Sequence, residues 1–219
     1  MDFKRITIIS GHYGSGKTHI AVNFAADLKK QQPNVALADM DIVNPYFRSK
    51  DSEQWLQDQG VRLICSPYAN SNVDIPALPQ EMYAVTDDAS LYSILDVGGD
   101  ERGALALGRI APAILAEDNF QMLYVINHFR PLTATAEDAI EVMREIENAC
   151  KLPFSGIVNN SNLGRETTPA DVLSSQAYAD EVAAKTGLPL ILTTVDISLY
   201  ASLKGEIQNL YPMRMQYKI

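Results

Sequence analysis

Short apolar runs alternate with amphipathic stretches from one end of the chain to the other. Residues 6–10 form a β-branched run typical of a buried parallel strand, and residues 19–30 carry Ile20, Phe24 and Leu28 along one face of a predicted helix. Further strands are predicted at 35–40, 61–65, 91–95, 121–127, 154–158 and 190–195, and further helices at 52–59, 103–116, 135–150 and 168–185. Strands that alternate with helices in this way build a mainly parallel sheet. We therefore expect an α/β fold, doubly wound with helices on both faces, in a single domain over residues 1–219.

Polar signals mark the ends of some of these elements. Thr135 and Thr168 are each followed by an aspartate three residues later, which resembles a capping box, and Pro169 stands at the first position of its helix. Residues 66–79 contain three prolines and little periodicity, which indicates a long irregular connection. The stretch after residue 195 is ambiguous in its pattern.

The segment between the first predicted strand and helix fits the phosphate-loop pattern G-x-x-x-x-G-K-[ST]. Glycines let backbone N–H groups curl around phosphates, a lysine reaches the outer phosphates, and a threonine hydroxyl binds Mg²⁺. The strand, the loop and the helix stand in the order that such a site requires. The predicted phosphate-binding residues are Gly11, His12, Tyr13, Gly14, Ser15, Gly16, Lys17 and Thr18.

Acidic residues stand at the ends of two predicted strands. Asp39 and Asp41 come at the end of the second strand, and Asp96 ends another apolar run, three residues before Gly99. Ligand sites of parallel sheets collect at the carboxyl ends of strands, and carboxylates bind Mg²⁺ or its waters. A glycine such as Gly99 offers an unobstructed N–H to a terminal phosphate. We therefore expect a magnesium-dependent nucleotide site with Thr18 and Asp96 at the metal, and a functional role for Asp39 and Asp41 beside them.

The composition mainly argues against certain binding partners and sites. The chain of 219 residues is 47% apolar and carries a formal net charge of −9, which disfavours nonspecific binding to nucleic acid or to an anionic membrane. Cys65 and Cys150 stand outside any cluster of metal ligands, so we expect reduced thiols rather than a disulfide or a zinc site. No apolar run approaches the roughly eighteen residues of a membrane span, so we expect a cytoplasmic location.

The order of these motifs resembles the CobQ/CobB/MinD/ParA nucleotide-binding family, the deviant-Walker branch of the SIMIBI-class P-loop proteins. The resemblance spans most of the chain, and the Asp-x-Asp that ends the strand after the P-loop helix is its most specific part. It implies ATP and Mg²⁺ as cofactors. It also implies that Lys17, Asp39 and Asp41 form the catalytic set, with Asp39 near Mg²⁺ as a further metal residue and Asp41 positioning the attacking water. Asn159 or Asn160 is implied to contact the base.

His12 departs from the family pattern, which has a lysine at this place. The family's lysine acts across a nucleotide-sandwiched dimer, whereas a neutral imidazole carries no permanent charge at pH 7. Both a second copy of the chain and another protein are therefore possible partners of this nucleotide site. Arg48 and Arg102 are the candidates for the missing positive charge.

Three functions follow from these motifs. The first is a slow, Mg²⁺-dependent ATPase that acts as a nucleotide-dependent switch. ATP is favoured over GTP because residues 159–162 lack the lysine and the terminal acid of a guanine-reading segment. The second is a small-molecule kinase or ATP-dependent ligase related to dethiobiotin synthetase or the cobyrinate amidation enzymes, with Asn44, His128, Arg130 and residues 66–79 around an acceptor pocket. The third is an accessory or maturation NTPase that acts on a protein partner.

Overall fold

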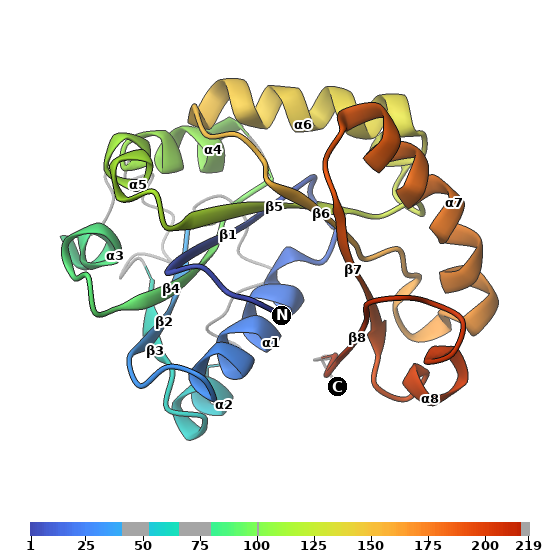
Figure 1. Cartoon of the computed structure of the whole chain (residues 1–219), viewed down its shortest axis with the longest axis horizontal. Helices are drawn as coiled ribbons and strands as arrows, with labels where there is room; N and C mark the ends of the chain where they lie inside the picture. Colours follow the sequence, from blue (N-terminus) through green and yellow to red (C-terminus); the bar gives the residue numbers. More distant parts are fainter. Residues whose placement is uncertain (41–52, 66–79, 100, 216–219) are drawn as a thin grey trace, which may run out of the picture.

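Parallel strands form one sheet in the computed structural model, which describes residues 1–40, 53–65, 80–99 and 101–215 (Figure 1). Over these residues the sheet has eight strands in the order β3-β2-β4-β1-β5-β6-β7-β8, and all neighbouring strands are parallel. The predicted α/β fold is confirmed. The strands are β1 (Ile6–Ser10), β2 (Val35–Asp39), β3 (Arg62–Ile64), β4 (Tyr92–Asp96), β5 (Phe120–Ile126), β6 (Gly156–Asn159), β7 (Leu190–Asp196) and β8 (Leu210–Met213).

Helices cover both faces of the sheet. Figure 1 shows α4, α5 and α6 on one face and α1 and α2 on the other. The α-helices of the described residues are α1 (Lys17–Lys29), α2 (Glu53–Asp58), α3 (Ala84–Asp87), α4 (Glu101–Gly108), α5 (Ala111–Glu117), α6 (Ala136–Cys150), α7 (Pro169–Thr186) and α8 (Tyr200–Leu203). Short 3₁₀ turns are η2 (Gln80–Tyr83), η3 (Pro131–Thr133) and η4 (Gly164–Glu166).

The central strands contribute to a separate core on each face. In β1, Ile6 and Ile8 belong to the core that α4, α5 and α6 cover, whereas Ile9 packs in the opposite core with Phe24 of α1. Every residue of β1 and β2 is therefore buried. Burial on both faces is the reason that these strands are continuous apolar runs rather than alternating ones.

The prediction of one helix at 103–116 is wrong, because the chain forms two helices there. The first, α4, ends at Gly108, and α5 begins at Ala111 with Pro112 in its first turn. Proline has no N–H to donate, and its ring clashes with the carbonyl of the preceding turn. A continuous helix is therefore interrupted before this proline, and a new helix starts with Pro112 in its first turn.

The stretch after residue 195, ambiguous in sequence, adds the last strand of the sheet. After the short helix α8, the strand β8 pairs in parallel with β7. Pro212 lies within β8 opposite Val195. A residue that cannot donate a hydrogen bond is tolerated there because β8 lies at the edge of the sheet.

The predicted caps are confirmed at two helix starts. The Thr135 hydroxyl accepts a hydrogen bond from the Asp138 N–H over 3.2 Å at the start of α6. At α7, Thr168 and Asp171 form a complete capping box with Pro169 in the first turn. Hydrogen bonds from Thr168 hold the pKa of Asp171 below its ordinary value. The local polar pattern therefore determines where these two helices begin.

Within the described residues, neither Cys65 nor Cys150 forms a disulfide. Cys150 is buried at the end of α6, and burial raises the pKa of its thiol, so it packs as a small apolar side chain. Within the described ranges, no helix has both the length and the apolar composition needed to cross a membrane.

Candidate nucleotide-binding site

The phosphate loop joins β1 to α1 at the carboxyl end of a central strand. Gly16 is the N-cap of α1 and has a φ of 90°, a left-handed conformation that favours glycine. The Ser15 N–H donates a hydrogen bond to the His12 carbonyl oxygen over 3.1 Å, which closes a turn within the loop. The N–H groups of the first turn of α1 point toward this loop, and the helix dipole there favours an anion.

Atoms pack so closely around the loop that glycines such as Gly99 and Gly16 leave no room for a side chain. A Cβ on Gly99 would lie 2.2 Å from the Gly11 carbonyl oxygen and 2.7 Å from the Tyr13 nitrogen. A Cβ on Gly16 would lie 2.1 Å from Nδ2 of Asn160. The segment after β4 therefore touches the phosphate loop through Gly99.

Lys17 is the buried cation of the loop. It is only 6% exposed, and its Nζ donates a hydrogen bond to the His12 carbonyl oxygen over 3.1 Å. An ammonium held against the loop in this way is already close to phosphates that the loop amides would bind. The hydroxyl of Ser15 is also buried and has no hydrogen-bond partner among the described residues. A bound phosphate or water would satisfy it.

Asp39 and Asp96 end neighbouring strands directly opposite each other. Their Cα atoms are partners in the register of β2 and β4, and the residues are 9% and 1% exposed. Thr18 stands in the first turn of α1, just after Lys17. Carboxylate and hydroxyl oxygens are the ligands that Mg²⁺ prefers, so this set of donors fits the ion. Asp41, the predicted water-positioning residue, lies outside the described residues.

Asn160 braces the phosphate loop from the neighbouring strand end. Its Nδ2 donates a hydrogen bond to the Ser15 carbonyl oxygen over 2.6 Å, and its Oδ1 accepts one from Thr194 of β7. Asn159 is fully buried, and its amide bonds with Ser161 and Ser175. Both asparagines hold the frame around the loop, and a contact of either with the base stays a prediction.

The turn after β5 carries Arg130, which the sequence named for an acceptor pocket, and follows Asn127, which the sequence did not name for the site. Arg130 lies beside the phosphate loop, because a Cβ on Gly14 would be 3.4 Å from its Nε and 3.5 Å from its Cζ. Asn127, at the end of the same strand, accepts hydrogen bonds through Oδ1 from the N–H groups of Phe129 and Asn162. The available signal was the place of these residues after an apolar strand. The sequence did not reveal that this strand lies next to β1.

The side chains of the two arginines named from the sequence for the missing positive charge are not among the described parts of the chain, so their role stays a prediction. Arg48 lies outside the described residues, and of Arg102 only the backbone in α4 is described. His128 packs its ring against Tyr178, with ring centroids 4.8 Å apart. The contact directs His128 toward α7 rather than toward the phosphate loop.

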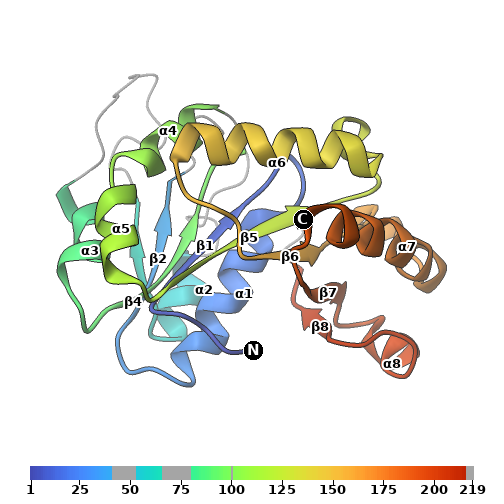
Figure 2. The same cartoon turned by 45° about the horizontal axis from the view of Figure 1, so that its top comes forward.

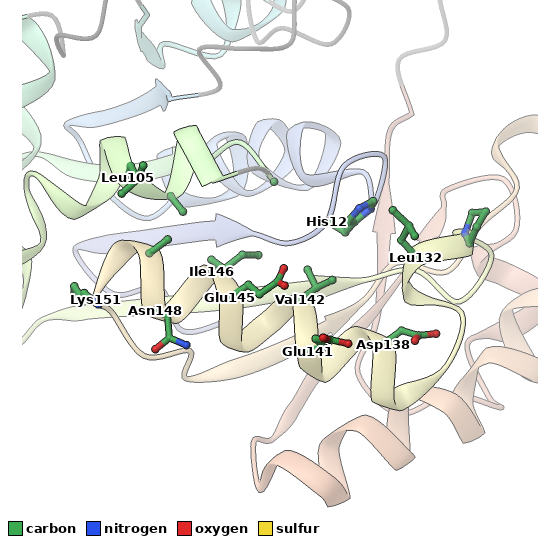
Figure 3. A pocket seen from close by; sticks show the side chains of 14 residues that line it. His12, Leu105, Leu132, Asp138, Glu141, Val142, Glu145, Ile146, Asn148 and Lys151 are labelled. Carbon is green, nitrogen blue, oxygen red and sulfur yellow. The ribbon is translucent and has the colours of Figure 1, made fainter.

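A groove of about 1020 Å³ lies between α4 and α6 and reaches the phosphate loop (Figure 3). Figure 2 shows these two helices side by side over the same face of the sheet. His12 and Gly99 line one end of the groove. Its walls include the apolar residues Leu105, Leu132, Val142 and Ile146 and the acidic residues Asp138, Glu141 and Glu145 of α6. Neither His128 nor Arg130 is among the described residues that line it, although both were expected at an acceptor pocket.

Solved structures share the fold of this chain at low sequence identity. Chloroplast FtsY from Physcomitrella patens superposes with a TM-score of 0.59 at 18% identity, over 88% of this chain and 59% of its own. The signal recognition particle receptor FtsY from Elizabethkingia anophelis in complex with GDP gives 0.54 at 16% identity, over 89% and 58%. The cell division protein FtsY from Thermotoga maritima gives 0.55 at 16% identity, over 89% and 62%. The chain therefore spans less than two thirds of the length of these relatives.

Sequence comparison gives a family. No curated protein matches the chain. A model of the CobQ/CobB/MinD/ParA nucleotide binding domain matches residues 6–184, which include the phosphate loop, both strand-end carboxylates and Asn160. The chain therefore belongs to the CobQ/CobB/MinD/ParA nucleotide-binding domain family.

Proposed function

We propose that this protein binds Mg²⁺ and ATP and hydrolyses ATP slowly as a nucleotide-dependent switch. One observation carries the proposal. The phosphate loop with its buried Lys17, the paired carboxylates Asp39 and Asp96, and the close contact of Gly99 with the loop all meet at one edge of the sheet. This arrangement supplies amides, a cation and metal ligands to a triphosphate, which are the groups that phosphoryl transfer needs.

The residues divide the work by their chemistry. Thr18, Asp39 and Asp96 would hold Mg²⁺ or its waters, and the ion supplies positive charge to the phosphates when it is bound. Lys17 and the loop amides neutralise phosphate oxygens. Asp41 is proposed to orient the attacking water, as its counterpart does in the family. Catalysis of this kind consists mainly of positioning and charge stabilisation.

ATP is the proposed nucleotide because residues 159–162, at the end of β6, lack the lysine and the terminal acid of a guanine-reading segment. Asn160 and Asn162 use their side chains within the protein, since Asn162 donates to the Asn160 carbonyl oxygen and accepts from the Gly164 N–H. Titration calorimetry with Mg²⁺ present is expected to give an affinity for ATP at least about tenfold higher than for GTP, and EDTA is expected to weaken binding.

The same titrations can contradict the proposal. An affinity for GTP equal to or above that for ATP would reject the choice of base, while binding of neither nucleotide would reject the function itself. Steady-state release of phosphate from ATP, measured on the same samples, tests hydrolysis separately from binding.

The groove between α4 and α6 favours a second candidate function, in which the nucleotide controls the docking of a protein partner. Leu105 and Leu132, which line it, are 51% and 63% exposed, and three carboxylates of α6 line the same groove. An apolar groove with an acidic wall fits an amphipathic, basic segment of a partner. It suits a cationic ligand better than the anionic acceptor of a small-molecule kinase or ligase.

A synthetic amphipathic helix of leucine and lysine serves as a probe for this groove. Its affinity, measured by fluorescence polarisation, is expected to fall by about tenfold or more when Glu141→Lys and Glu145→Lys are combined, because two attractions become repulsions. The pair Glu81→Lys and Glu206→Lys changes the net charge equally at exposed positions outside the groove and is the control. Equal losses in both double variants would show nonspecific attraction and reject the docking site.

A further inference from the structure

We propose that Arg130 supplies, from within the same chain, the positive charge that the family's signature lysine brings to the bound phosphates. The proposal rests on the nucleotide function proposed above and names one further residue for it. It starts from the position of the Arg130 side chain along Gly14 of the phosphate loop.

The backbone of Arg130 is fixed by a short network of hydrogen bonds. Its N–H donates to the Asn127 carbonyl oxygen over 3.1 Å, and its carbonyl oxygen accepts from the Thr133 N–H over 3.0 Å. The Thr133 hydroxyl also donates a hydrogen bond to the Asn127 carbonyl oxygen over 3.0 Å. Tyr178 of α7 closes the network, because its hydroxyl donates to the Thr133 carbonyl oxygen over 2.7 Å. Burial raises the pKa of Tyr178, so the phenol remains protonated and keeps this bond.

The side chain of Arg130 lies next to Gly14 of the phosphate loop. A Cβ on Gly14 would meet Nε, Cζ and Cδ of Arg130 at 3.4, 3.5 and 3.7 Å, so the guanidinium group lies along the loop backbone. Within the described residues no carboxylate forms an ion pair with it. In a chain with a net charge of −9, an exposed guanidinium without such a partner is ready to meet an anion.

The two basic residues within the phosphate loop, Lys17 and His12, are not placed to supply this additional positive charge. Lys17 belongs to the cradle itself, with Nζ on the His12 carbonyl oxygen. The Nδ1 atom of His12 lies 2.9 Å from the Tyr13 carbonyl oxygen, so its ring is directed to its own backbone. Imidazole also lacks a permanent charge at neutral pH. A guanidinium, in contrast, carries a permanent charge.

The position beside Gly14 indicates which phosphate is contacted. The amides of the phosphate loop cradle the inner phosphates, so a guanidinium along Gly14 lies next to the β-phosphate. In hydrolysis a water oxygen bonds to the γ-phosphorus while the bond from phosphorus to the β–γ bridging oxygen breaks. The bond's electron pair stays on the ADP oxygen, and the water loses a proton to solvent. A planar guanidinium can donate two hydrogen bonds to the charge that grows there.

Arg130→Ala tests the proposal, with Arg130→Lys as the conservative variant. We expect Arg130→Ala to raise the Kd of both ATP and ADP by about tenfold and to lower kcat by about a hundredfold, because a charge-assisted contact is lost and the leaving group is stabilised less. Arg130→Lys is expected to recover most of the affinity and only part of kcat, since an ammonium keeps the charge without the planar pair of donors.

Arg62→Ala is the matched control. Arg62 is an exposed arginine at the amino end of the outermost strand β3, whereas the phosphate loop lies at the carboxyl end of β1. If wild-type protein hydrolyses ATP and Arg130→Ala is indistinguishable from Arg62→Ala, the role of Arg130 is rejected while the proposed function stands. If wild-type protein binds no nucleotide, the proposed function itself fails. A specific activity that is constant over protein concentration supports a cation from the same chain, whereas one that rises with concentration overturns it.

Discussion

Lys17→Ala is expected to raise the Kd for ATP by at least about a hundredfold and to remove measurable turnover. Lys17 is the buried cation of the phosphate loop, and its ammonium already lies on a loop carbonyl oxygen. Loss of two charge-assisted hydrogen bonds to phosphate costs about 3 kcal/mol or more, which corresponds to that change in affinity. Titration calorimetry with ATP measures the effect directly.

Lys30→Ala is the control for this prediction. Lys30 immediately follows the same helix, is largely exposed, and forms an ion pair with Asp27 over 2.6 Å. Removing it changes the net charge of the chain by the same amount as removing Lys17. A similar loss of ATP affinity in both variants would indicate a general effect of charge and would contradict the role of Lys17 in the loop.

Gly99→Ala is expected to damage both the fold and the site. The added methyl group would meet only backbone atoms, the Gly11 carbonyl oxygen at 2.2 Å and the Tyr13 nitrogen at 2.7 Å. Because backbone cannot rotate away as a side chain can, the loop and the end of β4 have to separate. We expect the free energy of unfolding to fall by about 1–3 kcal/mol. Nucleotide affinity is expected to fall by more than about tenfold as the loop amides move.

Denaturant unfolding and calorimetry on one preparation measure these two effects together. Gly205→Ala is the matched substitution, because a Cβ on Gly205 has no atom within 4 Å. Gly99→Ala protein with wild-type stability and wild-type affinity would show that the contact between Gly99 and the loop is not needed.

The contact at Gly99 also connects the two functional features of the molecule. Gly99 touches the phosphate loop and lines the end of the groove between α4 and α6. A phosphate that draws Gly99 toward it would therefore change the shape of the groove at the same time. This connection is the physical basis on which a nucleotide would control a partner in the second candidate function.

Much of the fold was predictable because its signals are local. The apolar runs predicted every strand from β1 to β7, and the threonines at 135 and 168 predicted the starts of α6 and α7. The break before Pro112 was missed because apolar spacing continued through it, although the proline itself was a sufficient signal. The strand β8 was missed because an edge strand is short and only partly buried.

The candidate site was predictable only in part, because its motifs are local in the sequence whereas its contacts join distant segments. The phosphate loop and the acids at the ends of β2 and β4 follow from motifs and from the rule that ligands bind at the carboxyl ends of strands. Arg130 was expected at an acceptor pocket, yet it lies along Gly14. The contact of Asn160 with the base stays a prediction, whereas the bond of its side chain to the Ser15 carbonyl oxygen was not predicted. In both cases the residue was recognised and its neighbour was not.

The sequence by itself determined the chemistry of this protein, namely which groups are available to bind phosphate and metal, and the order of strands and helices that carries them. Only the tertiary structure decided which of these groups meet. Strand order is the reason, since β4 inserts between β2 and β1 while β5 and β6 follow on the other side. That order is set by burial of the whole sheet, so it places Gly99, Arg130 and Asn160 around one loop although no local pattern links them.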